Sequence, residues 1–171
     1  FDALAKVKFF SMIDLTSGYH QLPVGEESKE ITAFSTRKGH YEYNRVPMGM
    51  TNSPATFQRN MELILRGLTW QNCLVYVDDI IVFSGSFDDH LQQVQTVLGR
   101  LQGANLRIKP SKCKFFTKRV EYLGNVIQAG KIRPDSRNTE KIMQMPVPTT
   151  KKEMQSFLGL VGYYRRFIHQ F

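Results

Sequence analysis

Two short apolar runs enclose a pair of adjacent aspartates near the middle of the chain. The first run, Cys73–Tyr76, leads up to Asp78 and Asp79, and the second, Ile80–Phe83, follows them. Val, Ile, Tyr and Phe favour a pleated, buried backbone, so each run predicts a short strand. Because the runs are too close in sequence for a crossover connection, they are predicted to pair as a hairpin with the aspartates at its tip.

Further apolar runs predict strands on both sides of this hairpin. Val7–Leu15 predicts a buried strand that ends near Asp14. Residues 105–118 are basic and irregular, and no regular element is expected there. Two other strand pairs are predicted around turns that contain glycine. They are Ile31–Phe34 with Tyr41–Val46 around Lys38–Gly39, and the two halves of Val120–Ile127 around Gly124–Asn125.

Apolar residues at helical spacing predict three helices. Ser53, followed by proline, is a typical N-cap for the first helix. Ser86 is expected to open the second helix and Gly103 to end it, while Thr150 and Glu153 form a capping box for the third. The expected apolar faces are Phe57, Met61, Ile64, Leu65 and Leu68; then Phe87, Leu91, Val94, Leu98 and Leu101; then Met154, Phe157, Leu158, Val161 and Ile168. Because hairpins dominate, the pattern predicts an α+β fold, an antiparallel sheet with helices on one face.

Composition bounds the class of protein. The 171 residues suffice for one ordinary domain or part of a larger one, and 42% hydrophobic content indicates a packed core. Cys73 and Cys113 form no CxxC pair and have no histidine at zinc spacing. No membrane-spanning run or signal peptide is visible, so we expect an intracellular protein, cytoplasmic or nuclear, that is neither secreted nor in a membrane. Because the chain begins at Phe1 rather than Met, we expect a fragment of a longer polypeptide.

Charge is unevenly distributed along the chain. Residues 1–100 hold nine Lys and Arg against eleven Asp and Glu, a net charge of −2, whereas residues 101–171 hold fourteen against four, a net charge of +10. A basic segment beside an acidic one indicates a polyanionic partner such as nucleic acid. The alternative is a solvated surface that happens to be rich in lysine.

Three aspartates are candidates for a metal site. Asp14 ends one predicted strand, and Asp78 and Asp79 lie at the tip of another hairpin. If these strands are neighbours, the carboxylates converge at one edge of the sheet. Carboxylate oxygens suit magnesium, and two such ions can support phosphoryl or nucleotidyl transfer. The alternative is ordinary turn chemistry, because Asp is common in turns.

Five stretches and a C-terminal segment resemble, in order, the motifs of reverse transcriptases. The C-terminal segment is similar to the start of the thumb in long-terminal-repeat retrotransposons of the gypsy type. Each stretch alone is a weak indication of the family. The ordered set covers nearly the whole chain and is specific for reverse transcriptases. The segments are Phe10–Gln21, Val46–Gln58, Tyr76–Asp79, Leu106–Phe115, Val120–Gly124 and Thr150–Phe171.

The resemblance implies a polymerase palm with a ferredoxin-like core. It assigns residues 1–30 and 51–130 to the palm, residues 31–50 to a partial fingers hairpin and loop, and residues 131–171 to the start of the thumb or connection. It also implies an RNA-directed DNA polymerase from a retroelement polyprotein, which extends a primer on an RNA or DNA template with deoxynucleoside triphosphates. The polyprotein's remainder (fingers, thumb, ribonuclease H and integrase) would be its partners, in a virus-like particle of the intact element.

Two other interpretations stay open at this point. Most of the fingers region known from the family is missing, so the chain could be a truncated, inactive copy that only binds nucleic acid. A nucleotide cyclase with a two-metal palm is a further interpretation, which the ordered motifs disfavour.

The resemblance also implies roles around the metal site. Asp14, Asp78 and Asp79 would bind two Mg²⁺ ions, or Mn²⁺, with the help of the Leu15 carbonyl. Lys112 resembles the lysine that meets the leaving pyrophosphate. Its rivals are Lys109 and Lys114, and each of the three could equally be a solvated surface charge.

Further residues would contact the nucleotide. The backbone N–H groups of Ser17 and Gly18 would face the triphosphate. Tyr19 resembles the residue that excludes a ribose 2′-OH, although a core tyrosine would explain it too. Met48 and Gly49 resemble the loop beside the incoming base. Related retroviral enzymes often carry Gln in place of Met48, which could instead be a methionine that fills a gap.

The remaining roles concern template and primer. Tyr76 belongs to the third motif, and Leu123 with Gly124 resembles the hairpin that holds the primer 3′ end; an ordinary turn is the alternative. Basic side chains near the C-terminus would contact the phosphate backbone through charge. They are Lys151, Lys152, Arg165 and Arg166.

Overall fold

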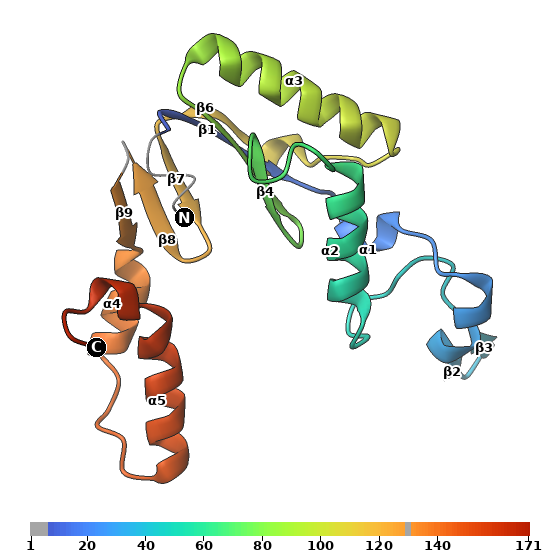
Figure 1. Cartoon of the computed structure of the whole chain (residues 1–171). Helices are drawn as coiled ribbons and strands as arrows, with labels where there is room; N and C mark the ends of the chain where they lie inside the picture. Colours follow the sequence, from blue (N-terminus) through green and yellow to red (C-terminus); the bar gives the residue numbers. More distant parts are fainter. Residues whose placement is uncertain (1–6, 129–130) are drawn as a thin grey trace.

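The computed structural model describes residues 7–128 and 131–171. Its centre is a four-stranded antiparallel sheet with the strand order β4-β5-β1-β6 (Figure 1). The predicted first strand and the predicted aspartate hairpin are both confirmed, because β4 pairs with β5 and β1 lies along the other side of β5. The strands are β1 (Phe9–Asp14), β4 (Cys73–Tyr76), β5 (Asp79–Ser84) and β6 (Lys114–Thr117).

Two helices, α2 (Ser53–Ile64) and α3 (Phe87–Gly103), cover one face of this sheet. Alternate residues of a strand point to opposite faces, so every second residue of β1 and β5 enters this core. The buried contributors from sheet and helices include Ile13, Ile80, Val82, Phe57, Met61, Leu65, Val94, Val97 and Leu101. Burial of these side chains holds the helices on the sheet.

A second antiparallel sheet, of order β7-β8-β9, packs against the opposite face. Its strands are β7 (Arg119–Tyr122), β8 (Asn125–Gln128) and β9 (Lys131–Pro134). The intervening core contains Phe10, Leu74, Ile81, Phe83, Val120, Tyr122 and Ile127. The predicted α+β fold, with helices on one face of an antiparallel sheet, is therefore confirmed.

The remaining elements lie outside the two sheets and the helices that cover them. A small hairpin and the last long helix lie on opposite sides of the molecule (Figure 1). No helix in the described part of the chain is long and apolar enough to cross a membrane. The remaining elements are α1 (Gly18–Gln21), η2 (Glu26–Ser28), η3 (Glu30–Thr32), β2 (Phe34–Thr36), β3 (Gly39–Tyr41), η4 (Pro110–Lys112), α4 (Ser136–Met143), α5 (Lys151–Tyr163) and η5 (Arg165–Phe167).

The strand predictions outside the central hairpin need correction. Ile31 lies in η3 rather than in a strand, and Tyr43 lies beyond the end of β3. All residues of β2 and β3 are exposed. These strands stay short because they have no hydrophobic core to pack against. The second hairpin turns at Leu123–Gly124, because Tyr122 pairs directly with Asn125. Strand β6 was not predicted, since it exists only through pairing with β1.

The predicted starts of α2 and α3 have different outcomes. The N-cap of α2 is Asn52, one residue earlier than predicted, and the Ser53 hydroxyl donates to the Pro47 carbonyl instead. The prediction for α3 is confirmed, since the Ser86 side chain accepts the Asp89 N–H at 3.2 Å.

The buried face of α3 differs from the prediction. Phe87 and Leu91 are exposed, while His90 and Val97 are buried beside the predicted Val94 and Leu101. The spacing of apolar residues does not identify His90, because histidine is a polar residue type. The end of the helix differs as well. Gly103 is the last helical residue, and the left-handed conformation typical of a cap falls on Asn105, at φ +56°.

Helix α5 begins as predicted. The Thr150–Glu153 capping box is present, with each side chain bonded to the backbone of the other residue. No residue of α5 is buried, however, so the predicted apolar face covers no core within the described chain.

Candidate active site

Asp14 and Asp79 lie opposite each other at the ends of β1 and β5. Asp79 also pairs with Tyr76 across the β4–β5 hairpin, and Asp78 precedes it in the tip of that hairpin. The strand register therefore brings together three carboxylates that are up to 65 positions apart in sequence. The convergence expected at one edge of the sheet is what the structure shows.

The hairpin tip is held by a residue to which the sequence analysis gave no role. The Gln58 side chain in α2 accepts a hydrogen bond from the Val77 N–H at 2.8 Å and donates one to the Val75 carbonyl at 3.2 Å. Gln58 lies within the second motif, but a polar residue one position after the buried Phe57 gave no signal of this contact.

Gly18 lies against the aspartate hairpin. It is buried, and a Cβ atom added to it would collide with the Asp78 carboxylate and with the ring of Phe57. The absence of a side chain therefore lets the α1 backbone approach Asp78. The preceding Ser17 has a left-handed backbone, φ +48°.

Burial and like charge act together on the hairpin carboxyls. Burial raises the pKa of Asp78, and the negative charges of Asp14 and Asp79 raise it further, against the opposing effect of the Lys112 ammonium. The pKa of Asp79 is raised by burial and by Asp14. The Oδ1 atom of Asp78 is buried, and no described residue bonds to it. The Lys112 ammonium therefore offsets only part of the effect of burial and of the repulsion between the carboxylates.

The carboxylates stop short of a preformed metal cage. Among residues 7–128 and 131–171, no three His, Cys, Asp or Glu side chains are arranged to hold a metal ion. The donor set nevertheless suits one, because a divalent cation would relieve the repulsion and give the Asp78 Oδ1 a partner. The carboxylate oxygens are the ligand type that magnesium prefers.

The three candidate lysines are placed differently. The Lys112 Nζ lies 3.5 Å from the Asp14 Oδ2, so its ammonium faces the carboxylates. Lys109 contributes its backbone N–H, which donates to the Asp14 carbonyl at 2.8 Å. Lys114 lies in β6, opposite Met12 of β1. The geometry therefore favours Lys112 for a role at the site, although that role stays a prediction.

Residues after β1 border the same site. Tyr19 is half-buried, and its ring centroid lies 5.2 Å from that of Phe57. Burial raises the pKa of Tyr19, and the neighbouring Asp78 and Tyr76 add to this effect. Leu15 is buried in the core and bridges to Ile108. A polar cavity of about 370 Å³ is lined by Thr16, Ser17, His20, Gln21, Arg45, Asn105 and Arg107.

The loop before α2 is open to solvent. Met48 is 63% exposed, so it fills no gap, which corrects the alternative offered for it. Gly49 has φ +93°, a conformation that few residues other than glycine adopt. The proposed contact of both residues with a base stays a prediction.

The candidate nucleic-acid residues lie in the aspartate hairpin, in the β7–β8 turn and in the C-terminal elements, and Tyr76 and Leu123 line one cavity. Tyr76 is 56% exposed on β4. Leu123 and Gly124 form the β7–β8 turn, both with positive φ. The four basic candidates are exposed, two at the start of α5 and two in η5; they are Lys151, Lys152, Arg165 and Arg166.

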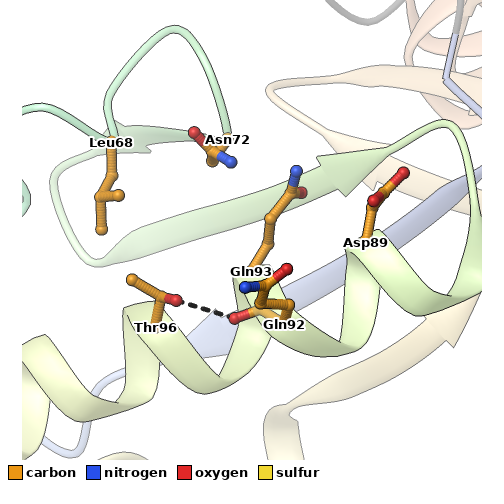
Figure 2. Close-up of a pocket in the computed structure, with 6 residues that line it drawn as sticks. All are labelled: Leu68, Asn72, Asp89, Gln92, Gln93 and Thr96. Atoms are coloured by element: carbon orange, nitrogen blue, oxygen red, sulfur yellow. Dashed lines mark hydrogen bonds between the residues drawn. The ribbon is translucent and has the colours of Figure 1, made fainter.

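A separate cavity lies away from the carboxylates. Figure 2 shows this space of about 280 Å³ beside α3, lined by Leu68, Asn72, Asp89, Gln92, Gln93 and Thr96. It borders the start of α3, near the Ser84 end of β5 rather than the Asp79 end. Its carboxylate, Asp89, accepts a hydrogen bond from Ser86 as part of the helix cap, so the cavity offers no evident catalytic group.

The central sheet, its helices and the carboxylates at the sheet edge define a polymerase palm. Residues 1–127 match the family described as reverse transcriptase (RNA-dependent DNA polymerase), and the chain belongs to this family. Two relatives from Drosophila melanogaster are the retrovirus-related Pol polyproteins from transposons 297 and gypsy, 48% identical over 165 residues and 42% over 168. These alignments cover 96% and 98% of this chain, and the chain spans 16% of each relative.

A solved structure shows the same fold. A foamy viral protease–reverse transcriptase in complex with double-stranded DNA superposes with a TM-score of 0.83 and 31% identity, over 94% of this chain and 28% of that chain. The predicted resemblance to reverse transcriptases of gypsy-type retrotransposons is thus confirmed.

Proposed function

We propose that the chain is the palm portion of a retroelement reverse transcriptase and carries its catalytic carboxylates. The observation that carries this proposal is the pairing of Asp14 with Asp79, with Asp78 beside them. The reaction would be template-directed DNA synthesis: a primer 3′-OH attacks the α-phosphate of a deoxynucleoside triphosphate, and pyrophosphate leaves.

Asp14, Asp78 and Asp79, with the Leu15 carbonyl, would hold two Mg²⁺ ions, for which Mn²⁺ could substitute. Bound there, the ions would activate the attacking oxygen and stabilise the leaving group. The raised pKa values of Asp78 and Asp79 support this proposal, because a cation would favour their charged forms.

The chain's own residues would orient the nucleotide. The N–H groups of Ser17 and Gly18 would face the triphosphate, next to the polar and basic cavity that Ser17 lines. The Lys112 ammonium, already directed at Asp14, would meet the leaving pyrophosphate. Tyr19 would limit the space at the sugar, and Met48 with Gly49 would flank the base.

The partners would be a primer and an RNA or DNA template. The family's description names RNA-dependent synthesis, and the foamy viral relative was solved with double-stranded DNA. Other parts of a polyprotein would supply fingers, the rest of the thumb, ribonuclease H and integrase. We place the protein inside the cell, in the cytoplasm or the nucleus. The intact carboxylate site speaks against the alternative of an inactive copy.

The test is primer extension by a longer version of the protein that includes neighbouring polyprotein segments. Asp78→Asn should lower extension by about 10²–10³-fold or more, because it removes charge at the reacting centre. Affinity for the primer–template duplex should change little. Asp88→Asn, an exposed carboxylate on α3, is the matched control.

Metal binding by the 171-residue chain provides a second measurement. Titration calorimetry with Mn²⁺ should show binding that Asp78→Asn abolishes and Asp88→Asn retains. Extension that persists in Asp78→Asn would contradict the proposal. If the unsubstituted longer protein binds the duplex but extends no primer, the result would support the alternative that the chain is an inactive copy.

A further inference from the structure

Helix α5 is tied to the rest of the protein by two tyrosines at its C-terminal end. The Tyr163 hydroxyl donates to the Leu123 carbonyl at 2.5 Å, and the Tyr164 hydroxyl donates to the Gly124 carbonyl at 3.4 Å. No residue of α5 itself is buried, whereas Tyr164, its C-cap, is 6% exposed. The attachment of α5 is therefore concentrated at this end.

Both carbonyl groups of the Leu123–Gly124 turn accept a second hydrogen bond. The Leu123 carbonyl also accepts from the Asn125 side chain at 2.9 Å, and the Gly124 carbonyl from the Asp135 N–H at 3.0 Å. Each turn carbonyl thus accepts two hydrogen bonds, one from Asn125 or Asp135 and one from a tyrosine. Leu123 has φ +46°, which is unfavourable for this residue type.

Packing at Gly124 shows how closely Tyr164 approaches the turn. A Cβ atom at this position would lie 3.0 Å from the Tyr164 hydroxyl and 3.2 Å from the Asn138 side-chain nitrogen. The ring of Tyr163 packs edge-on against that of Tyr164, with centroids 4.9 Å apart. The two tyrosines therefore form one unit on the turn.

We propose that Tyr163 and Tyr164 form a hydroxyl latch that fixes the angle of α5 on the Leu123–Gly124 turn. The latch would keep the basic start of α5 in a constant position relative to the aspartate hairpin. The 13 residues of α5 span about 20 Å, so a rotation of about 10° at the latch moves the far end by about 3 Å. The tyrosines are positioning residues, and their effect on DNA synthesis rests on the proposed function, whereas the latch itself does not.

The first experiment measures the latch without any reaction. Spin labels at Gln155→Cys on α5 and Gln95→Cys on α3, both exposed positions, report the distance between the helices. Cys73 is buried, and Cys113 is replaced by Ser in all samples. We expect the double substitution Tyr163→Phe and Tyr164→Phe to broaden the distance distribution, with displacements of about 2 Å at Gln155, about 12 Å from the latch. Tyr41→Phe, on the exposed hairpin, should leave it unchanged.

An unchanged distribution in the double variant would overturn the latch. If the labelled variant fails to fold, amide exchange of residues 123–125 in the unlabelled protein replaces the distance measurement. Faster exchange in the double variant, with Tyr41→Phe unaffected, would support the latch, and equal exchange would overturn it.

The second experiment tests the consequence for synthesis, in the longer protein. Single-turnover extension of a pre-bound primer should slow by about tenfold or more in the double variant, because small misplacements of reacting groups are costly. Duplex affinity should change far less than the rate. A broadened distance with an unchanged extension rate would overturn the positioning role. If the unsubstituted longer protein extends no primer, the proposed function fails while the distance measurement still decides the latch.

Discussion

The side-chain amide of Gln58 and the backbone N–H of Val77 form a hydrogen bond that supports the tip of the aspartate hairpin. Val77 has φ +52°, a left-handed conformation that is rare for a β-branched residue. Because Asp78 follows directly, the direction of its carboxylate depends on this backbone. Helix α2 thus takes part in shaping the site through one polar side chain.

Replacing Gln58 should loosen the hairpin tip. Gln58→Ala removes two hydrogen bonds to the hairpin and an exposed one to Glu62, and we expect a loss of about 1–2 kcal/mol in the free energy of unfolding. Urea unfolding measures this loss, with Gln95→Ala on the exposed side of α3 as the control. In the longer protein the same change should also slow primer extension. Equal unfolding midpoints for Gln58→Ala and the original chain would show that these hydrogen bonds contribute nothing to stability.

Binding to a primer–template duplex should depend steeply on salt, because counterions released from phosphates drive it. Lys151→Ala with Lys152→Ala should make the slope of log affinity against log salt shallower by about 1–2, the value for one or two lost phosphate contacts. Lys141→Ala, an exposed lysine on α4, is the control and should have a smaller effect. A slope that the double substitution leaves unchanged would mean that these lysines do not touch phosphate.

Tyr19 should determine which sugar is accepted. In the longer protein, Tyr19→Ala should raise the ratio of kcat/KM for a ribonucleotide over a deoxyribonucleotide by about tenfold or more, because it removes a steric wall. Tyr19→Phe keeps the ring and should keep the original ratio. If Tyr19→Ala lowers activity for both sugars equally, Tyr19 acts only in packing against Phe57.

His90 should make stability depend on pH. It is buried, its Nε2 lies 2.7 Å from the Ser11 hydroxyl, and the rings of Phe9 and Phe116 face it. Burial lowers its pKa below 6.5, the ordinary value that the unfolded chain retains. The unfolded state therefore binds more protons as pH falls below 6.5, and stability is lost there.

Urea unfolding between pH 7.5 and 5.5 checks this expectation. The contribution of His90 cannot exceed about 1.4 kcal/mol per pH unit, the limit for one proton. His90→Gln should reduce the pH dependence in this window, whereas His20→Gln, an exposed histidine, should not. An identical pH dependence in His90→Gln would show that another group is responsible.

Local features were predicted well from the sequence. The Asp78–Asp79 hairpin, the Ser86 cap and the Thr150–Glu153 capping box each depend on residues within a few positions of one another. The hydrophobic pattern there specifies strand or helix directly. The sequence also identified the three aspartates as candidates, because carboxylates at strand ends stand out among apolar residues.

Only the tertiary structure decided which residues far apart in the sequence come into contact. Three contacts join residues far apart in the sequence. Asp14 pairs with Asp79 across 65 positions, Gln58 bonds to Val77 across 19, and Tyr163 bonds to Leu123 across 40. It also decided that β6 is a strand and that α5 has no buried residue. The physical reason is that a side chain's burial and partners depend on which elements pack beside it, and the spacing of residues along one element does not specify its neighbours.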